Sequence, residues 1–210
     1  GYFTCNDDFA RDISDVFNVI TGYSQPARWK RVISAPYDLR EYFMELIDQE
    51  IAFHKEYKTG LIFAKMNSLE DTKIVDKLYE ASRAGVKVRL VVRGICILVP
   101  GVAGLSENIQ VKSVIGRFLE HSRIFLFNNN SNFRIFLSSA DWMSRNFDKR
   151  IELLFEIYKQ DFKDQLRGVL EDCWKDNQRA RELVAGRKYV LAKAAKEKFS
   201  VQEAFLGRYS

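Results

Sequence analysis

The chain has 210 residues, of which 47% are hydrophobic and 13% aromatic, so it can bury a sizeable core and is not intrinsically disordered. The formal net charge of +5 lies near the end of the chain, because residues 179–210 hold eight Lys or Arg and three Glu, whereas the two signs balance in the remainder. The chain has three cysteines without a CxxC pair and no signal peptide, which argues against a secreted protein. It also has no Cys/His cluster with zinc spacing, no GxxxxGK[ST] loop and no stretch that could span a membrane, which argues against a zinc-binding, P-loop or membrane-embedded protein.

The first part of the chain is expected to form two helices with a short strand between them. Apolar residues recur at helical spacing over residues 7–20, and Asn6 or Asp7 can act as the N-cap. A second helix is predicted over residues 38–56. His54, late in that helix, is interpreted as a solvated residue favoured by the helix dipole.

A strand, a helix and a second strand follow with short links. The pattern places them at residues 60–66, 69–84 and 86–92, with Gly85 at the helix exit as a C-cap should be. Such a unit predicts two parallel, adjacent strands joined by a right-handed crossover.

Polar side chains stand where these two strands end. Lys65 and Asn67 end the first strand and Arg93 follows the second, at the edge of the sheet where ligands of such folds bind. Arg93 either pairs with a carboxylate or faces an anionic ligand, and its forked donors suit a phosphate. The loop at 95–108 could cover this place before a strand at 109–114.

The central stretch runs from Gly116 to Trp142 and holds two apolar runs, 124–127 and 133–137, joined by an Asn-rich turn of hairpin length. Both faces of the first run are apolar, which predicts a strand covered on both sides in an α/β sheet. The side chains expected at the neighbouring strand ends are an imidazole, a guanidinium, two hydroxyls and a carboxylate: His121, Arg123, Ser138, Ser139 and Asp141.

Each of these residues also has a purely structural interpretation. His121 fits a hydrogen-bonded structural histidine as well as a catalytic one. Asp141 fits the N-cap of a helical turn at Trp142–Asn146, and Arg150 with Glu152 fits a surface ion pair across one face of a strand.

The last part of the chain is expected to add a strand, a helix and a tail. In the strand at 150–157, Ile151, Leu153, Phe155 and Ile157 are predicted to face the core, with the alternate residues facing away. A helix follows at 162–176. Residues 179–210 read as a weak amphipathic helix whose basic face is either solvated or bound to an anionic partner.

Several long motifs resemble the C-terminal domain of polyphosphate kinases, the family that works through a phosphohistidine. They are Val91–Cys96, Pro100–Ile109, Gly116–Arg123 and Leu137–Met143. The resemblance implies the second of two tandem phospholipase-D-like domains over residues 1–178, built as a mixed α/β sheet flanked by helices on both faces, with 179–210 as a basic helical tail. Because no initiator Met is present, we expect the chain to be a piece of a longer protein.

The resemblance also assigns roles. Arg93 and His121 match the family's nucleotide-contacting Arg and its second essential His, whereas the phosphorylated His lies in the preceding domain. We therefore expect half an active site, inactive alone, with His121 catalytic and with ATP phosphates held by Arg93, Lys65, Asn67, Arg123 and Ser138. The expected partners are ATP or ADP, inorganic polyphosphate, the preceding domain and further copies of the enzyme, but no nucleic acid. Mg²⁺ is expected to arrive with ATP, and no protein ligands for it are expected in this chain. The enzyme is expected to be cytoplasmic, with or without peripheral attachment to a membrane.

One motif departs from the phospholipase D superfamily, whose signature is His-x-Lys-x4-Asp. Here the sequence reads His121-x-Arg123-x4-Asn128, so the Lys and the Asp are both replaced. This argues against a stand-alone phosphodiesterase. A phosphodiesterase or nuclease half-site and a non-catalytic polyanion-binding or assembly domain remain as alternatives.

Overall fold

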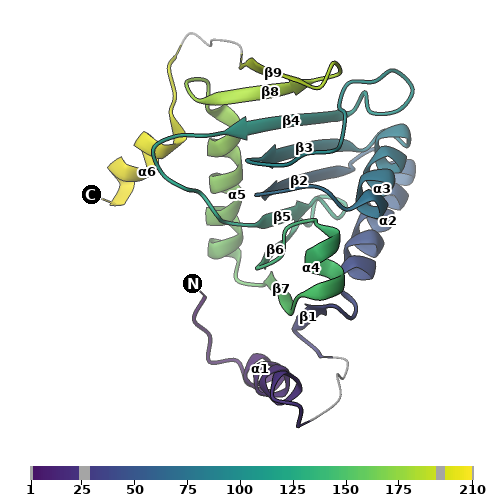
Figure 1. The fold of residues 1–210 in the computed structure, drawn as a ribbon, viewed down its shortest axis with the longest axis vertical. Coiled ribbons are helices and arrows are strands. Elements are labelled where there is room, and N and C mark those ends of the chain that lie inside the picture. Colours follow the sequence, from purple (N-terminus) through teal and green to yellow (C-terminus); the bar gives the residue numbers. More distant parts are fainter. Residues whose placement is uncertain (1, 24–28, 193–196, 210) are drawn as a thin grey trace.

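The computed structural model describes residues 2–23, 29–192 and 197–209. They form one mixed sheet of nine strands in the order β1-β7-β6-β5-β2-β3-β4-β8-β9, with helices on both faces (Figure 1). The strands are β1 (Val32–Ala35), β2 (Leu61–Met66), β3 (Lys87–Val92), β4 (Ile109–Val114), β5 (Ile124–Phe127), β6 (Arg134–Ser138), β7 (Glu152–Ile157), β8 (Ala180–Val184) and β9 (Lys188–Leu191). The helices are α1 (Asp7–Ile20), α2 (Leu39–Tyr57), α3 (Thr72–Arg83), α4 (Ser144–Lys149), α5 (Gln160–Lys175) and α6 (Val201–Tyr209). The predicted fold class is confirmed.

Four segments meet at what we name the carboxyl end of the sheet, formed by residues 66–68, 93–95, 121–124 and 138–141. Strands β2 and β3 are parallel around α3, as predicted, so both end there. Strand β5 is antiparallel to β2 and begins at this end, and β6 is antiparallel to β5 and finishes at it. The topology thus brings together side chains that are far apart in the sequence.

Helices α2 and α3 lie on one face of the sheet and α5 on the other (Figure 1), and a hydrophobic core fills the space on each face. Phe125 and Phe127 join the core under α2 and α3, where the ring of Phe43 lies 4.8 Å from that of Phe125. Ile124 and Leu126 join the core under α5. The prediction that this strand is covered on both faces is confirmed, and full burial of each such side chain contributes about 1.5–3 kcal/mol.

The expected alternation of inward and outward residues near β7 is wrong. Leu154, expected to face away from the core, is fully buried, whereas Ile151 precedes the strand and is 51% exposed. Leu154 faces the core under α2 and α3, whereas Leu153 and Phe155 on the other face of β7 are only partly buried and line a cavity with Tyr2 and Phe9.

The interpretation of residues 179–210 as a weak amphipathic helix is wrong. Strand β8 pairs antiparallel with β4, β9 pairs with β8, and only α6 is helical among the described residues of this segment. Ala180 and Leu183 of β8 and Val201 of α6 are buried, so β8 and α6 pack on the body of the protein, whereas every residue of β9 is exposed. The open edge of β4 supplies hydrogen-bond partners for β8, and the sequence of residues 179–210 alone does not predict this pairing.

The described part of the chain holds no helix with the length and apolar character that crossing a membrane would require.

Candidate functional site

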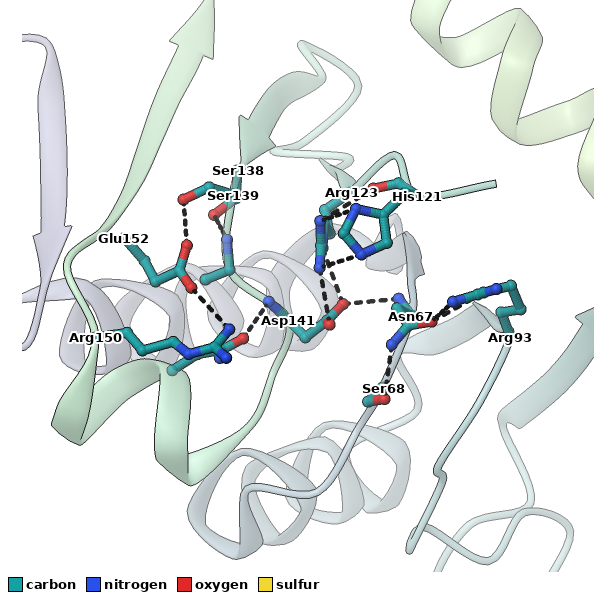
Figure 2. Close-up of polar contacts among 12 residues, drawn as sticks. Asn67, Ser68, Arg93, His121, Arg123, Ser138, Ser139, Asp141, Arg150 and Glu152 are labelled. Atoms are coloured by element: carbon teal, nitrogen blue, oxygen red, sulfur yellow. Dashed lines mark hydrogen bonds and ion pairs between the residues drawn. The ribbon is translucent and has the colours of Figure 1, made fainter. Parts of the chain in front are cut away.

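The carboxyl end of the sheet gathers a chain of polar contacts that links most of the predicted site residues (Figure 2). Asn67 follows β2, Arg93 follows β3, Arg123 precedes β5 and Asp141 follows β6. The predicted convergence of strand ends is therefore observed for these four residues and for His121.

A buried carboxylate, Asp141, stands at the centre of this group with 3% exposure. Its Oδ1 accepts hydrogen bonds from the backbone N–H of Asn67 at 2.7 Å and from Nε of Arg123 at 3.1 Å, and its Oδ2 accepts from Nη2 of Arg123 at 3.0 Å. The N-cap of α4 is Met143, so the alternative that Asp141 caps this helix is wrong. A two-point contact of this kind fixes both the orientation and the charge of the guanidinium.

The guanidinium of Arg123 in turn holds His121. Nη1 lies 2.9 Å from Nδ1 of the imidazole and Nη2 lies 3.1 Å from Nε2, so the two planar groups lie against each other, as Figure 2 shows. Nη1 also donates to the carbonyl oxygen of His121 at 3.1 Å. His121 is exposed, and both of its ring nitrogens face the guanidinium, so Arg123 sets the orientation of the ring.

Arg93 pairs with an amide and not with a carboxylate. Its Nε donates to Oδ1 of Asn67 at 2.8 Å, its Nη2 contacts the same oxygen, and Nδ2 of Asn67 donates to Ser68 at 3.1 Å. Because Asn67 is neutral, it orients the guanidinium without cancelling its charge. Of the two alternatives for Arg93, this arrangement favours an anionic ligand.

Two predicted phosphate ligands are turned toward other partners. Lys65 is 4% exposed; its Nζ donates to Oγ of Ser122 at 3.0 Å and lies 3.3 Å from a carboxylate oxygen of Glu120. The hydroxyl of Ser138 donates to the carbonyl of Leu153 at 2.8 Å and accepts the N–H of Ala140 at 3.0 Å. The structure therefore does not bring Lys65 or Ser138 into the open group with Arg93 and His121.

Ser139, Glu152 and Arg150 form a second group beside the first (Figure 2). The hydroxyl of Ser139 donates to the carboxylate of Glu152 and accepts the N–H of Leu153 at 3.0 Å. Glu152 is 8% exposed and lies 3.8 Å from the half-exposed Arg150. The predicted ion pair is therefore present, but only Arg150 lies at the surface, because the Glu152 carboxylate is buried.

The other histidine has a structural role. Nδ1 of His54 accepts the N–H of Gly60 at 3.1 Å, and the ring lies against Gly85, so it is not simply a solvated residue at a helix end. Burial, followed by the charges of Lys58 and Lys87, lowers the pKa of His54. His121 is thus the histidine that remains for phosphate chemistry.

Two further features lie away from this group. Asn128, which replaces the Asp of the phospholipase D signature, follows β5 at the opposite end of the strand, and its Nδ2 donates to the carbonyl of Thr59 at 2.8 Å. A cavity of about 400 Å³ lies between β4, β8 and Trp174, with Lys112 and Glu182 in its lining, and contains none of the predicted site residues.

Comparison with known proteins gives a consistent result. The model of the family described as polyphosphate kinase C-terminal domain 2 matches residues 32–202. A curated relative, polyphosphate kinase of Halalkalibacterium halodurans, is 50% identical over 182 residues, which are 87% of this chain and 26% of that protein. The crystal structure of polyphosphate kinase from Porphyromonas gingivalis is similar to 98% of this chain at 36% identity with a TM-score of 0.93, and 32% of that chain is covered.

A more distant structure is similar in fold alone. It is Nuc of Salmonella typhimurium, a phospholipase D family member, with a TM-score of 0.54 and 15% identity over 73% of this chain and 97% of that chain. The predicted phospholipase-D-like sheet agrees with this likeness. The chain spans about a quarter of the length of the curated relative described above.

Proposed function

The chain belongs to the polyphosphate kinase C-terminal domain 2 family, and on this premise we propose that it supplies one half of an active site that reversibly transfers the terminal phosphate of ATP to inorganic polyphosphate. One observation carries the proposal: the exposed imidazole of His121 and the oriented guanidinium of Arg93 share the carboxyl end of the sheet with the Arg123–Asp141 pair. Phosphoryl transfer depends on positioning and charge neutralisation, and this group offers both.

Arg93 is the proposed phosphate clamp. Asn67 holds its Nε at 2.8 Å and leaves its charge unneutralised, so the donors of the fork that Asn67 does not use can face the oxygens of a phosphate. Asn67 acts through Arg93, and its own side chain is already shared between Arg93 and Ser68.

His121 is the proposed proton carrier. When the exposed ring turns one nitrogen from Arg123 to the substrate, it can give a proton to the departing ADP oxygen or take one from the attacking end of the polyphosphate chain. Arg123 positions the ring, and the negative charge of Asp141 compensates Arg123, so that the pair adds little net charge beside the histidine.

The other half of the site belongs to sequence outside this chain. We propose that the preceding domain contributes the phosphorylated histidine and that the two halves face each other across the bound phosphates, in an enzyme that assembles from several copies. The share of the curated relative that this chain covers, 26%, leaves ample sequence for that half.

Mg²⁺ would enter as the counterion of ATP, as part of the substrate. Among residues 2–23, 29–192 and 197–209, no group of three or more His, Cys, Asp or Glu side chains could hold a metal ion. The carboxylate at the centre of the site, Asp141, is already shared between Arg123 and Asn67. We propose that this chain contributes phosphate contacts, while Mg²⁺ arrives bound to ATP.

Two substitutions in the full-length enzyme that contains this chain test the proposal. His121→Ala should lower kcat for polyphosphate synthesis by at least about 100-fold, because the proton transfer partner is lost. Arg93→Ala should raise KM for ATP and also lower kcat, because a charge-assisted phosphate contact is lost.

Arg11→Ala is the matched control, since Arg11 is exposed on α1. Its steady-state kinetics should stay near wild type. Near-normal synthesis by His121→Ala would refute the catalytic role, and an equal effect of Arg11→Ala would show that the loss reflects net charge alone.

A further inference from the structure

The loop that joins β4 to β5, residues 115–123, carries His121 and Arg123 and is held from behind by residues that the proposed reaction does not use. Glu120 and Ser122 alternate with His121 and Arg123 along this segment. The first two contact Lys65, whereas the other two contact each other. The position of the histidine therefore depends on what anchors the alternate residues.

One anchor is Gln202, in the first turn of α6 and 6% exposed. Its Oε1 accepts the N–H of Phe118 at 3.0 Å, and its Nε2 donates to the carbonyl of Phe118 at 2.9 Å and to Oε1 of Glu120 at 2.9 Å. The amide thus pairs with the main chain of Phe118 much as a neighbouring strand would, and all its donors are engaged.

Gly116 lets the loop close over this amide. A Cβ at this position would lie 2.7 Å from Cδ of Gln202 and 3.1 Å from its Nε2, closer than atoms normally approach. A side chain at residue 116 would therefore push the loop and Gln202 apart.

The second anchor is the ion pair between the buried Lys65 and the partly buried Glu120, whose charged atoms lie 3.3 Å apart. Nζ of Lys65 also donates to Ser122 at 3.0 Å, so the same ammonium group contacts the residues before and after His121. The thiol of Cys173 lies 3.9 Å from the Glu120 carboxylate, and burial raises the pKa of this thiol to about 12, so it stays protonated. Breaking one member of such a network leaves buried polar groups without partners.

We propose that Gln202, through Phe118 and Glu120, is a positioning residue that sets the place of His121. The inference rests on the proposed function, because it assigns Gln202 a purpose through His121. The guanidinium of Arg93 is oriented by the side chain of Asn67, which contacts neither Gln202 nor Glu120, so we expect the loss of Gln202 to act on the histidine more than on the phosphate clamp. A displacement of about 1 Å in a catalytic group can lower a rate by about 100-fold.

The kinetic test is Gln202→Leu in the full-length enzyme, which removes the three hydrogen bonds at similar side-chain volume. We expect kcat to fall at least about tenfold while KM for ATP changes less than about threefold, because the loop moves and Arg93 does not. Gly116→Ala should produce the same pattern, a lower kcat with little change in KM for ATP, because it disturbs the contact from the loop side while the sequence of α6 stays the same. It serves as the second variant if Gln202→Leu fails to fold.

Val201→Ala is the matched control. Val201 is fully buried in the core under α5, next to Gln202 in the sequence, so its truncation loosens α6 without touching the loop. It should lower the unfolding temperature and leave kcat within about twofold. A drop in kcat equal to that of Gln202→Leu would overturn the positioning role, because general loosening of α6 would then be sufficient.

A spectroscopic readout separates this inference from the proposed function. The chain has two histidines, so ¹³C-labelled histidine gives two Cε1–H signals, assigned with His54→Gln. In the 210-residue chain, Gln202→Leu should shift or broaden the His121 signal and leave the His54 signal in place.

An unchanged His121 signal together with an unchanged kcat would refute the positioning role even if His121→Ala abolishes turnover. A displaced His121 signal in an enzyme that tolerates His121→Ala would support the positioning contact and refute the proposed function.

Discussion

At the scale of single residues, the basic side chains at the carboxyl end of the sheet are of two kinds: those paired with a carboxylate and those that are not. Arg123 is compensated by Asp141 and Lys65 by Glu120, each at ion-pair distance. Arg93 contacts the neutral side chain of Asn67 instead, and no ion pair of Arg93 is found within the described ranges 2–23, 29–192 and 197–209. Compensated residues build the site, whereas Arg93 keeps its attraction for an anion.

Replacement of the buried carboxylate tests this division. Asp141→Asn should lower the free energy of unfolding by about 3 kcal/mol, because Arg123 would remain largely buried without its counter-charge. Urea denaturation of the 210-residue chain, followed by circular dichroism, measures the change.

Asp161→Asn is the control, since the Asp161 side chain is 80% exposed in its ion pair with Lys159. Surface pairs of this kind contribute little, so its effect should stay within about 0.5 kcal/mol. Equal stabilities of the two variants would contradict the structural role given to the Arg123–Asp141 pair.

At the scale of elements, the sequence predicts those parts of the fold whose signals are local. The βαβ unit and β5 follow from apolar runs and turn residues. The observed strands 61–66, 87–92 and 124–127 match the predicted ranges to within one residue. The convergence of Asn67, Arg93 and His121 follows in turn from that topology.

What the sequence does not predict depends on contacts between distant segments. Lys65 lies two residues after the buried Phe63, so the alternation along the strand already places its side chain on a covered face. Its ion-pair partner, Glu120, lies 55 positions further along the chain and cannot be identified from the local sequence. The pairing of Asp141 with Arg123 competes with a local capping role, and the tertiary contact prevails. The β8–β9 hairpin forms because β4 has an open edge with which β8 pairs, and the sequence of residues 179–210 does not predict that pairing.

The hairpin itself provides a test at this scale. Leu183 of β8 is 8% exposed and joins the core, whereas Leu191 of β9 is 68% exposed. Leu183→Lys should lower the free energy of unfolding by about 2–4 kcal/mol, because a core contact is lost and a charge is brought to a buried place.

Leu191→Lys is the matched substitution on the exposed strand and should be nearly neutral. Thermal unfolding of both variants provides the comparison. A tolerated lysine at position 183 would mean that β8 does not pack on the body of the protein.

For the molecule as a whole, the open site predicts different behaviour for binding and for turnover. The 210-residue chain alone should give no measurable phosphoryl transfer, because it lacks the half that we assign to the preceding domain. Calorimetric titration with ATP at low ionic strength should still detect binding, since Arg93 is oriented in the chain by itself.

Arg93→Ala should weaken that binding at least about tenfold, and Arg11→Ala should not. Phosphoryl transfer by the isolated chain would contradict the assignment of half a site.

The spacing of the site residues along the chain also has a consequence for folding kinetics. Asn67, Arg93, His121 and Asp141 are separated by 20 or more positions each, and they meet only after β2 has paired with both β3 and β5. Closing such long loops costs entropy before any contact offsets it, so these pairings are expected late in the folding reaction. Intermediates that lack them would hold neither the compensated pair nor the oriented Arg93. Affinity for phosphate would thus arise only in molecules that have completed the sheet.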